Sequence, residues 1–222
     1  MIAQTHPILN GPLFDFAGGG TGGHIYPAIA VARAIRDQVD DARFLFLGTK
    51  RPIDRRITET INCEFVPQAL SGLSLAPWRM VKAYLDFRRA SASCFERFVS
   101  DRPVVVVGTG GMAAAPAVRE AFRAGIPTAL FNPDAIPGKA NRHLTSKTKC
   151  LFAQFEQTVA HFPHDVEVSV SGCPVRPEFH TAKRAEGVIA FGLNSDLKTL
   201  LITGASLGAR TVNQAVVANV DF

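Results

Sequence analysis

The sequence of 222 residues is 47% hydrophobic and 19% charged, which is ordinary for a globular protein and long enough for one full domain and part of a second. Its formal net charge of +5 favours acidic partners, such as phosphates, nucleic acid or an anionic membrane surface, without choosing among them. No apolar run approaches the roughly 20 residues of a membrane-spanning helix, and residues 1–10 lack the basic start and apolar core of a signal peptide. The four cysteines are widely spaced without a metal-ligand pattern, so we expect reduced thiols in a cytoplasmic protein.

Apolar runs and helical patterns alternate along most of the chain. Strands are predicted at Leu13–Ala17, Arg43–Leu47, Glu64–Pro67, Val104–Val107, Thr128–Phe131, Cys150–Ala153 and Val166–Ser171. Helices are predicted at Tyr26–Val39, Asp54–Ile61, Pro77–Val99 and Ala114–Arg123. This alternation predicts an α/β fold, in which a parallel sheet carries helices on both faces.

Residues 174–186 are rich in proline and charge, which is typical of a linker. After them the pattern restarts with two predicted strands, Val188–Phe191 and Thr199–Thr203, and a helix from about Thr211. One β-turn-α unit cannot bury a core by itself, so we expect the incomplete start of a second Rossmann-like domain; the alternative is that these elements extend the edge of the first sheet. The expected division is an N-terminal domain at residues 1–173, a linker at 174–186 and the start of a second domain at 187–222.

Three glycine-rich turns each follow a predicted strand. They are Gly18–His24, Gly108–Gly111 and Gly204–Arg210. Glycine lets backbone N–H groups approach an anion closely, and the helix that follows points its positive end at the same place. The turns therefore favour a protein that handles two phosphorylated ligands. The alternative is that they only close tight strand-to-helix connections.

Two common phosphate chemistries fit the first turn poorly. Gly18, Gly20 and Gly23 satisfy the dinucleotide pattern G-x-G-x-x-G, but the second predicted strand ends in Gly48–Arg51 without the acid that would hold a ribose. No Gly-Lys-Ser/Thr follows the glycines, so the pattern also disfavours a P-loop NTPase. A nicotinamide-dependent oxidoreductase stays only as a weak alternative.

The segment Gly19–Ala28 resembles the first signature of the MurG family, which belongs to glycosyltransferase family 28 and transfers N-acetylglucosamine to lipid I in bacterial peptidoglycan synthesis. The resemblance continues in order through Leu47–Thr49, Ser71–Leu73, Val107–Gly111, Ala124–Pro127, Pro137–Arg142, Gly172–Arg176 and Gly204–Arg210. It implies a GT-B fold, in which two Rossmann-like domains face each other across a cleft. The acceptor then binds the N-terminal domain and the nucleotide-sugar binds the C-terminal domain.

The reaction that the resemblance implies inverts the sugar C1. N-acetylglucosamine moves from UDP-GlcNAc to the 4-hydroxyl of the muramyl pentapeptide of undecaprenyl-diphosphate lipid I, which gives lipid II. A base takes the hydroxyl proton, and positive groups stabilise the departing UDP without a cofactor or a metal. The implied partners are UDP-GlcNAc, lipid I and an anionic membrane surface, with no nucleic acid. The implied location is the cytoplasmic face of the bacterial inner membrane.

The resemblance also implies roles for particular residues. The catalytic candidates are His24 and Asp134. The acceptor diphosphate is assigned to Gly20, Thr21, Gly22, Gly23, Gly108, Thr109, Gly110 and Gly111. UDP-GlcNAc is assigned to Thr21, Gly22, Gly23, Asp134, Arg176 and Ser206. The alternatives are that His24 caps its helix or donates to phosphate, and that Arg176 braces the linker.

Several positions depart from the family pattern. Asn132 stands where a glutamate is usual, and Asp134 stands where an asparagine contacts the donor sugar. Leu207, Met112 and Asp54 are further departures, from Gln, Tyr and Glu. These changes keep two alternatives open: a related GT-B enzyme with another acceptor, and a non-catalytic module that binds a lipid diphosphate or a membrane. For the 222 residues as they stand, we expect acceptor binding without turnover.

The predicted helix Pro77–Val99 combines apolar and basic residues near its start. The membrane-contact candidates are Trp78, Arg79, Lys82 and Tyr84. Such a helix suits an anionic membrane surface. The alternative is that its apolar side chains face the domain's own core.

Overall fold

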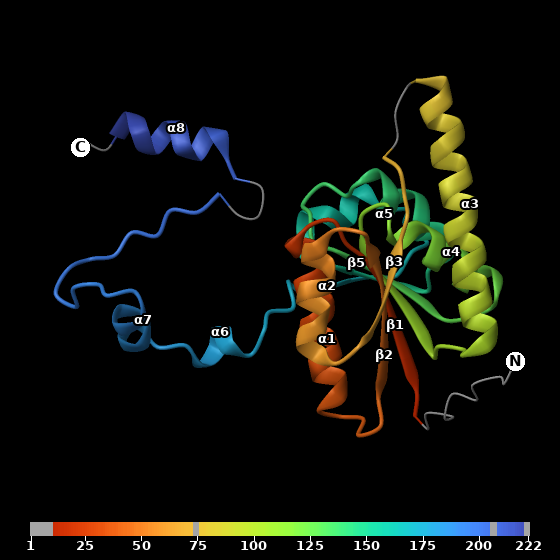
Figure 1. Ribbon diagram of the computed structural model, residues 1–222, viewed down its shortest axis with the longest axis horizontal. Helices are drawn as coiled ribbons and strands as arrows, with labels where there is room; N and C mark the ends of the chain where they lie inside the picture. Colours follow the sequence, from red (N-terminus) through yellow and green to blue (C-terminus); the bar gives the residue numbers. More distant parts are fainter. Residues whose placement is uncertain (1–10, 73–75, 205–207, 220–222) are drawn as a thin grey trace, which may run out of the picture. The chain divides into compact units, whose positions relative to one another are not determined.

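The computed structural model describes residues 11–72, 76–204 and 208–219. It divides into two units, Met1–Arg176 and Pro177–Phe222. In the first unit, seven parallel strands form one sheet in the order β3-β2-β1-β4-β5-β6-β7. Figure 1 shows the sheet between its covering helices. The strands are β1 (Leu13–Gly18), β2 (Arg43–Thr49), β3 (Glu64–Gln68), β4 (Val105–Gly110), β5 (Thr128–Asn132), β6 (Cys150–Ala153) and β7 (Val168–Val170).

Helices follow the strands and cover both faces of the sheet. They are α1 (Gly22–Arg36), α2 (Pro52–Thr58), α3 (Pro77–Ser100), α4 (Ala114–Arg123) and α5 (Lys139–Leu144), with short 3-10 helices η1 (Glu59–Ile61), η2 (Thr145–Lys147) and η3 (Glu156–His161). One face carries α1 and α2, and the other carries α3 and α4 (Figure 1). The predicted α/β class is therefore confirmed.

Alternating side chains of the central strands fill two separate cores. In β2, Leu45 and Leu47 pack on the α3 and α4 side, whereas Phe44 and Phe46 pack on the α1 and α2 side. Successive strand residues point to opposite faces, so a strand that is buried on both faces is apolar throughout. This explains why the sequence pattern of Arg43–Leu47 is a continuous apolar run after its first residue.

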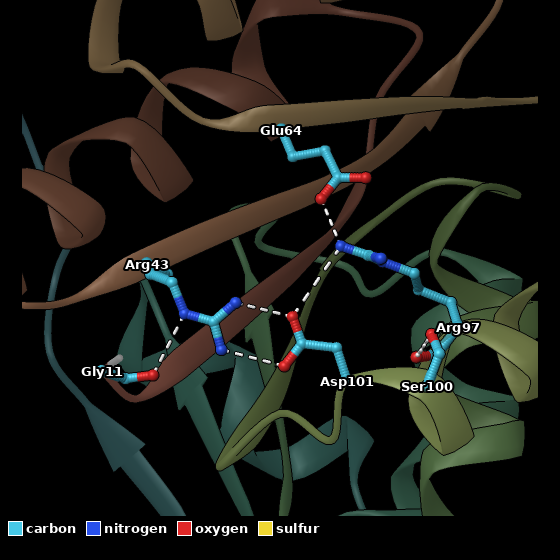
Figure 2. Close-up of polar contacts among 6 residues, drawn as sticks. All are labelled: Gly11, Arg43, Glu64, Arg97, Ser100 and Asp101. Atoms are coloured by element: carbon cyan, nitrogen blue, oxygen red, sulfur yellow. Dashed lines mark hydrogen bonds and ion pairs between the residues drawn. The ribbon is translucent and has the colours of Figure 1, made fainter. Parts of the chain in front are cut away.

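An ion network fixes the amino edge of the sheet (Figure 2). Arg43, the first residue of β2, donates to both carboxylate oxygens of Asp101 at 2.6 and 2.9 Å and to the Gly11 carbonyl at 3.1 Å. Arg97 of α3 pairs with Glu64 at the start of β3, and its guanidinium lies 3.9 Å from Asp101. The hydrogen bonds from Arg43 lower the pKa of Asp101. The network thus ties the starts of two strands to the end of α3.

The second unit contains three helices in its described residues, α6 (Glu178–Thr181), α7 (Arg184–Ala190) and α8 (Arg210–Asn219). The predicted strands at Val188–Phe191 and Thr199–Thr203 are wrong, because α7 takes most of the first and the second has no regular structure. No described side chain of this unit is buried, and none of its described segments pairs as a strand. Without a neighbouring strand, a single extended segment leaves its backbone groups unpaired.

Candidate active site

The carboxyl ends of β1, β2, β4 and β5 meet at one edge of the sheet, where ligands of open α/β sheets bind. The first glycine turn joins β1 to α1, and the second joins β4 to α4. The two turns approach each other closely: a Cβ placed on Gly111, whose φ is +76°, would lie 3.0 Å from the Gly19 carbonyl oxygen. Gly19 has a φ of +143°, and a Cβ there would lie 2.3 Å from a carboxylate oxygen of Asp54. Both positions therefore require glycine.

The His24 ring lies between the two turns. Its Nδ1 is 3.3 Å from the Gly19 carbonyl oxygen and 3.3 Å from the Thr21 hydroxyl. On the other side, a Cβ on Gly110 would lie 3.1 Å from His24 Nε2. A carbonyl oxygen only accepts hydrogen bonds, so we assign the ring proton of the neutral imidazole to Nδ1, which leaves the lone pair on Nε2. His24 is thereby held in the tautomer that a general base needs.

The start of α1 offers backbone donors at the same place. Thr21 precedes the helix, and its side chain does not cap it. The first N–H groups of any helix have no partner within it, so the amides of Gly22 and Gly23 point outward at the positive end of a 15-residue helix. This arrangement favours an anion next to His24.

Asp54 of α2 is buried and shapes the first glycine turn. Its carboxylate accepts hydrogen bonds from the Gly20 amide at 3.0 and 3.2 Å, the Thr49 amide at 2.8 Å and the Thr49 hydroxyl at 2.6 Å. Arg51 donates to the Gly20 carbonyl at 2.7 Å. In this structure the Gly20 amide is therefore engaged by Asp54, and this contact holds the turn in shape.

Two residues assigned to the acceptor diphosphate belong to the sheet interior. The side chain of Thr109 is 1% exposed, and its hydroxyl donates to the Ala17 carbonyl at 3.4 Å. A Cβ on Gly108 would lie 2.7 Å from a Leu130 methyl group, so this glycine makes room for core packing. Of the second turn, the structure brings Gly110 and Gly111 to His24.

An asparagine pair supports the second turn from β5. Asn132 is fully buried at the end of β5, and its side-chain oxygen accepts a hydrogen bond from Asn141 at 2.9 Å. Asn132 also donates to the Asp134 carbonyl at 2.5 Å, which leaves the Asp134 side chain exposed to solvent. The Asn141 side-chain nitrogen lies 3.8 Å from where a Cβ of Gly110 would be. The pair therefore couples the predicted catalytic segment around Asp134 to the turn beside His24.

Arg176 lies beside the start of α1, because the ring of Tyr26 that it contacts would lie 3.1 Å from a Cβ on Gly22. The Arg176 guanidinium stacks over the Tyr26 ring at 4.5 Å from its centroid. Ser206 and Leu207 lie outside the described residues. On α3, Trp78 is 73% exposed and Tyr84 is 59% exposed. Within the described parts of the chain, no helix is long and apolar enough to cross a membrane.

Sequence reasoning missed the supporting residues of the site. Asp54 was noted only as a departure, and Asn141 lies in a motif to which no role was assigned. The only signal for Asn141 was its position in Pro137–Arg142, and no local pattern pointed to the hydrogen bonds of Asp54. Among the described residues, no three His, Cys, Asp or Glu side chains gather in a way that would hold a metal ion.

Comparisons with known proteins show the family to which this chain is similar. A model of the glycosyltransferase family 28 N-terminal domain matches residues 14–153. A UDP-N-acetylglucosamine–N-acetylmuramyl-(pentapeptide) pyrophosphoryl-undecaprenol N-acetylglucosamine transferase of Desulfitobacterium hafniense is 37% identical over 206 residues, which cover 90% of this chain and 54% of that protein. The protein of the same name from Desulforamulus reducens is 38% identical, over 91% of this chain and 55% of its own length. The chain thus spans about half the length of the curated relatives it matches.

Solved structures agree on the fold. The crystal structure of Acinetobacter baumannii MurG matches with a TM-score of 0.59 and 24% identity, over 79% of this chain and 47% of that one. A UDP-GlcNAc 2-epimerase from Neisseria meningitidis matches with a TM-score of 0.53 and 15% identity, over 73% of this chain and 46% of that one. At these identities the likeness shows a shared fold and nothing about chemistry.

Proposed function

The chain belongs to glycosyltransferase family 28, and on that premise we propose that it supplies the acceptor side of an inverting N-acetylglucosaminyltransferase. The proposed acceptor is the muramyl pentapeptide of undecaprenyl-diphosphate lipid I, the proposed donor is UDP-GlcNAc, and the product is lipid II. One observation carries the proposal: two glycine turns and the start of α1 converge on His24 at the carboxyl edge of the sheet. The relatives named for this reaction support the choice of substrates.

In the proposed reaction His24 acts as the base. Its Nε2 takes the proton from the acceptor 4-hydroxyl while that oxygen forms a bond to C1 of the donor sugar. The bond from C1 to the UDP oxygen breaks, and the electron pair leaves with UDP. The contact of Nδ1 with the Gly19 carbonyl supports this role, because in the neutral ring it leaves Nε2 as the nitrogen that can accept the proton. The exposed carboxylate of Asp134 is the second candidate for the base.

The acceptor diphosphate is proposed to bind the free amides of Gly22 and Gly23 and the backbone of Gly110 and Gly111. Backbone N–H groups and the helix dipole supply positive charge there, so the proposal includes no metal or cofactor. The alternative role of His24, as a donor to this phosphate, uses the same geometry with the imidazole protonated. Loss of the imidazole should lower turnover if His24 is the base, and should weaken acceptor binding if His24 donates to the phosphate.

We also propose that α3 rests on an anionic membrane at the cytoplasmic face, where a lipid-linked acceptor is found. Residues 77–82 of this helix are all exposed, and the exposed set includes Trp78, Arg79, Lys82 and Tyr84. Aromatic and basic side chains together favour the interface of a negatively charged bilayer. Sedimentation with vesicles tests this: a Trp78→Ala, Lys82→Ala chain should bind vesicles of anionic lipid more weakly, and vesicles of neutral lipid should bind neither chain.

The test of the function is transfer of labelled N-acetylglucosamine from UDP to a lipid I analogue. It uses the 222-residue chain beside a chain extended to the relatives' full length, each with and without His24→Ala. Transfer by the extended chain that His24→Ala abolishes is the expected result. A folded extended chain that transfers nothing to lipid I analogues would overturn the proposal.

A second candidate is a related GT-B enzyme with a different substrate. The segment Asn132–Asp134 favours it, because this segment departs from the family pattern. The Asn132 side chain is engaged in hydrogen bonds with Asn141 and the Asp134 carbonyl, so it does not face a ligand in this structure. A screen of donor sugars and acceptors with the extended chain separates the two candidates. Binding of a lipid diphosphate without turnover of any pair would instead favour a non-catalytic module.

A further inference from the structure

A groove of about 700 Å³ opens beside the first glycine turn, within the first unit. It runs from the turn to the start of α3, between the ends of β2 and β3. Its wall includes Gly20, Lys50, Arg51, Gln68, Lys82 and Met112. The proposed reaction uses none of these side chains, so the groove is a site without an assigned ligand.

The floor of the groove contains an unpaired hydrogen-bond acceptor. Gln68, the last residue of β3, is 6% exposed, and its amide nitrogen donates to the Ala113 carbonyl at 2.8 Å. Because the nitrogen donates to Ala113, the other terminal atom is assigned as the oxygen Oε1, which is buried beneath the wall of the groove. This oxygen has no hydrogen-bond partner among the described residues. A buried acceptor without a partner is costly, so it favours a ligand that brings an N–H or O–H group.

The mouth of the groove carries net positive charge. Lys50 is exposed and, in the described part of the chain, pairs with no acid. Arg51 lines the groove and also donates to the Gly20 carbonyl, so it joins the groove to the glycine turn. The charge of Lys82 is already compensated, because its ammonium group contacts Asp86 at 2.5 Å. Lys50 and Arg51 therefore favour a ligand with a carboxylate or another anionic group.

We propose that this groove binds the anionic peptide arm of the acceptor. A peptide carboxylate lies at Lys50, and a peptide N–H reaches Gln68 Oε1 through a local shift of the groove wall that covers this oxygen. The inference rests on the proposed function, which places the acceptor diphosphate at the adjoining glycine turn and gives the acceptor a pentapeptide. A peptide meets both demands of the groove, since it carries N–H donors along its length and a carboxylate at its end.

The test titrates two soluble compounds into the 222-residue chain: muramyl pentapeptide diphosphate without the lipid, and the same sugar diphosphate without the peptide. Calorimetry should show tighter binding of the compound with the peptide. Lys50→Glu should weaken that binding about fivefold, as expected for a solvent-exposed charge contact, and leave the peptide-free compound unchanged. The NMR signals of the Gln68 side-chain amide should shift only with the peptide-bearing compound.

Lys149→Glu is the matched control, because Lys149 is exposed and precedes β6 at the opposite edge of the sheet. It should change neither affinity. Equal affinity of the two compounds, or equal weakening of both by Lys50→Glu, would overturn the peptide assignment while the diphosphate site stands. If neither compound binds, the result contradicts both the proposed acceptor and the assignment of the groove to its peptide.

Discussion

At the amino edge of the sheet, Arg43, Glu64, Arg97 and Asp101 compensate one another's charges, whereas at the carboxyl edge the buried carboxylate of Asp54 accepts hydrogen bonds from backbone amides and a hydroxyl. The first arrangement uses side chains to fix where strands and a helix begin and end. The second fixes only part of a turn and leaves the amides of Gly22 and Gly23, at the start of α1, without partners among the described residues. The same sheet is thus closed by ion pairs at its amino edge, whereas its carboxyl edge leaves backbone donors available among the described residues.

This difference predicts that changes at the two edges separate activity from stability. The largest expected effect is that of His24→Ala at the carboxyl edge. In the chain extended to the relatives' length, kcat should fall by about 10²- to 10⁴-fold, because general-base catalysis contributes about that much. The free energy of unfolding should change by less than about 1 kcal/mol, since the ring is half-buried and outside both cores. Steady-state kinetics and urea unfolding measure the two quantities.

His143→Ala is the control for this prediction, because His143 is exposed on α5. It should leave kcat unchanged. A His24→Ala protein that keeps its kcat but binds the acceptor more weakly would assign His24 to the phosphate instead of the proton.

Asp54→Ala should affect both properties, because the carboxylate of Asp54, on α2, accepts the hydrogen bonds that hold the first glycine turn against the end of β2. The change leaves the half-buried amides of Gly20 and Thr49 without their acceptor, which costs up to about 1–3 kcal/mol for each unsatisfied group. Urea unfolding should therefore give a loss of about 3 kcal/mol, and affinity for a muramyl diphosphate should fall as the turn loses its shape. Asp54→Asn retains one acceptor oxygen and should lose less of both. Unchanged affinity in Asp54→Ala would separate the shape of the turn from binding.

The features that the sequence predicted correctly are formed by residues close together in the chain. The glycine turns and His24 are adjacent in the chain, and the predicted bounds of α4 and β6 are those of the structure. The hydrogen bonds of Asp54 to Gly20 were not predictable, because they join residues 34 positions apart through the pairing of β1 and β2. The two wrong strands at 188–191 and 199–203 have the composition of strands without a neighbour to pair with.

Asp15 lies between the two edges, in the middle of β1. Among the described residues its carboxylate has neither an ion-pair partner, as at the amino edge, nor a hydrogen-bond donor, as at the carboxyl edge. Its side chain is fully buried, and both carboxylate oxygens lack hydrogen bonds to the described residues. Burial raises its pKa well above the usual value of 3.8. The folded state therefore binds a proton that the unfolded state releases, and the protein loses stability as the pH rises from about 4 toward the raised pKa.

Asp15→Asn removes this titration, so the free energy of unfolding of the variant should rise relative to the parent as the pH increases from 4 to 8, and the difference should shrink as the pH approaches 4. Thermal or urea unfolding from pH 4 to 8 measures it. Leu13→Val, elsewhere in the same strand and core, is the control, because it shortens a buried side chain without changing a charge. A constant difference between Asp15→Asn and the parent at every pH would mean that Asp15 stays ionised.

The smallest expected effect concerns the amino edge itself. The Arg43 and Asp101 side chains are 22% and 27% exposed, so solvent screens their pair in part. A double-mutant cycle with Arg43→Met and Asp101→Asn should give a coupling of about 1 kcal/mol at pH 7. Because the Arg43 hydrogen bonds lower the folded-state pKa of Asp101, this coupling is fully present above the ordinary pKa of 3.8 and is lost as the pH falls below it. Acceptor affinity should be the same in all four proteins of the cycle. A loss of affinity in either single variant would mean that the two edges of the sheet are coupled, and that the amino edge helps to set the shape of the glycine turns.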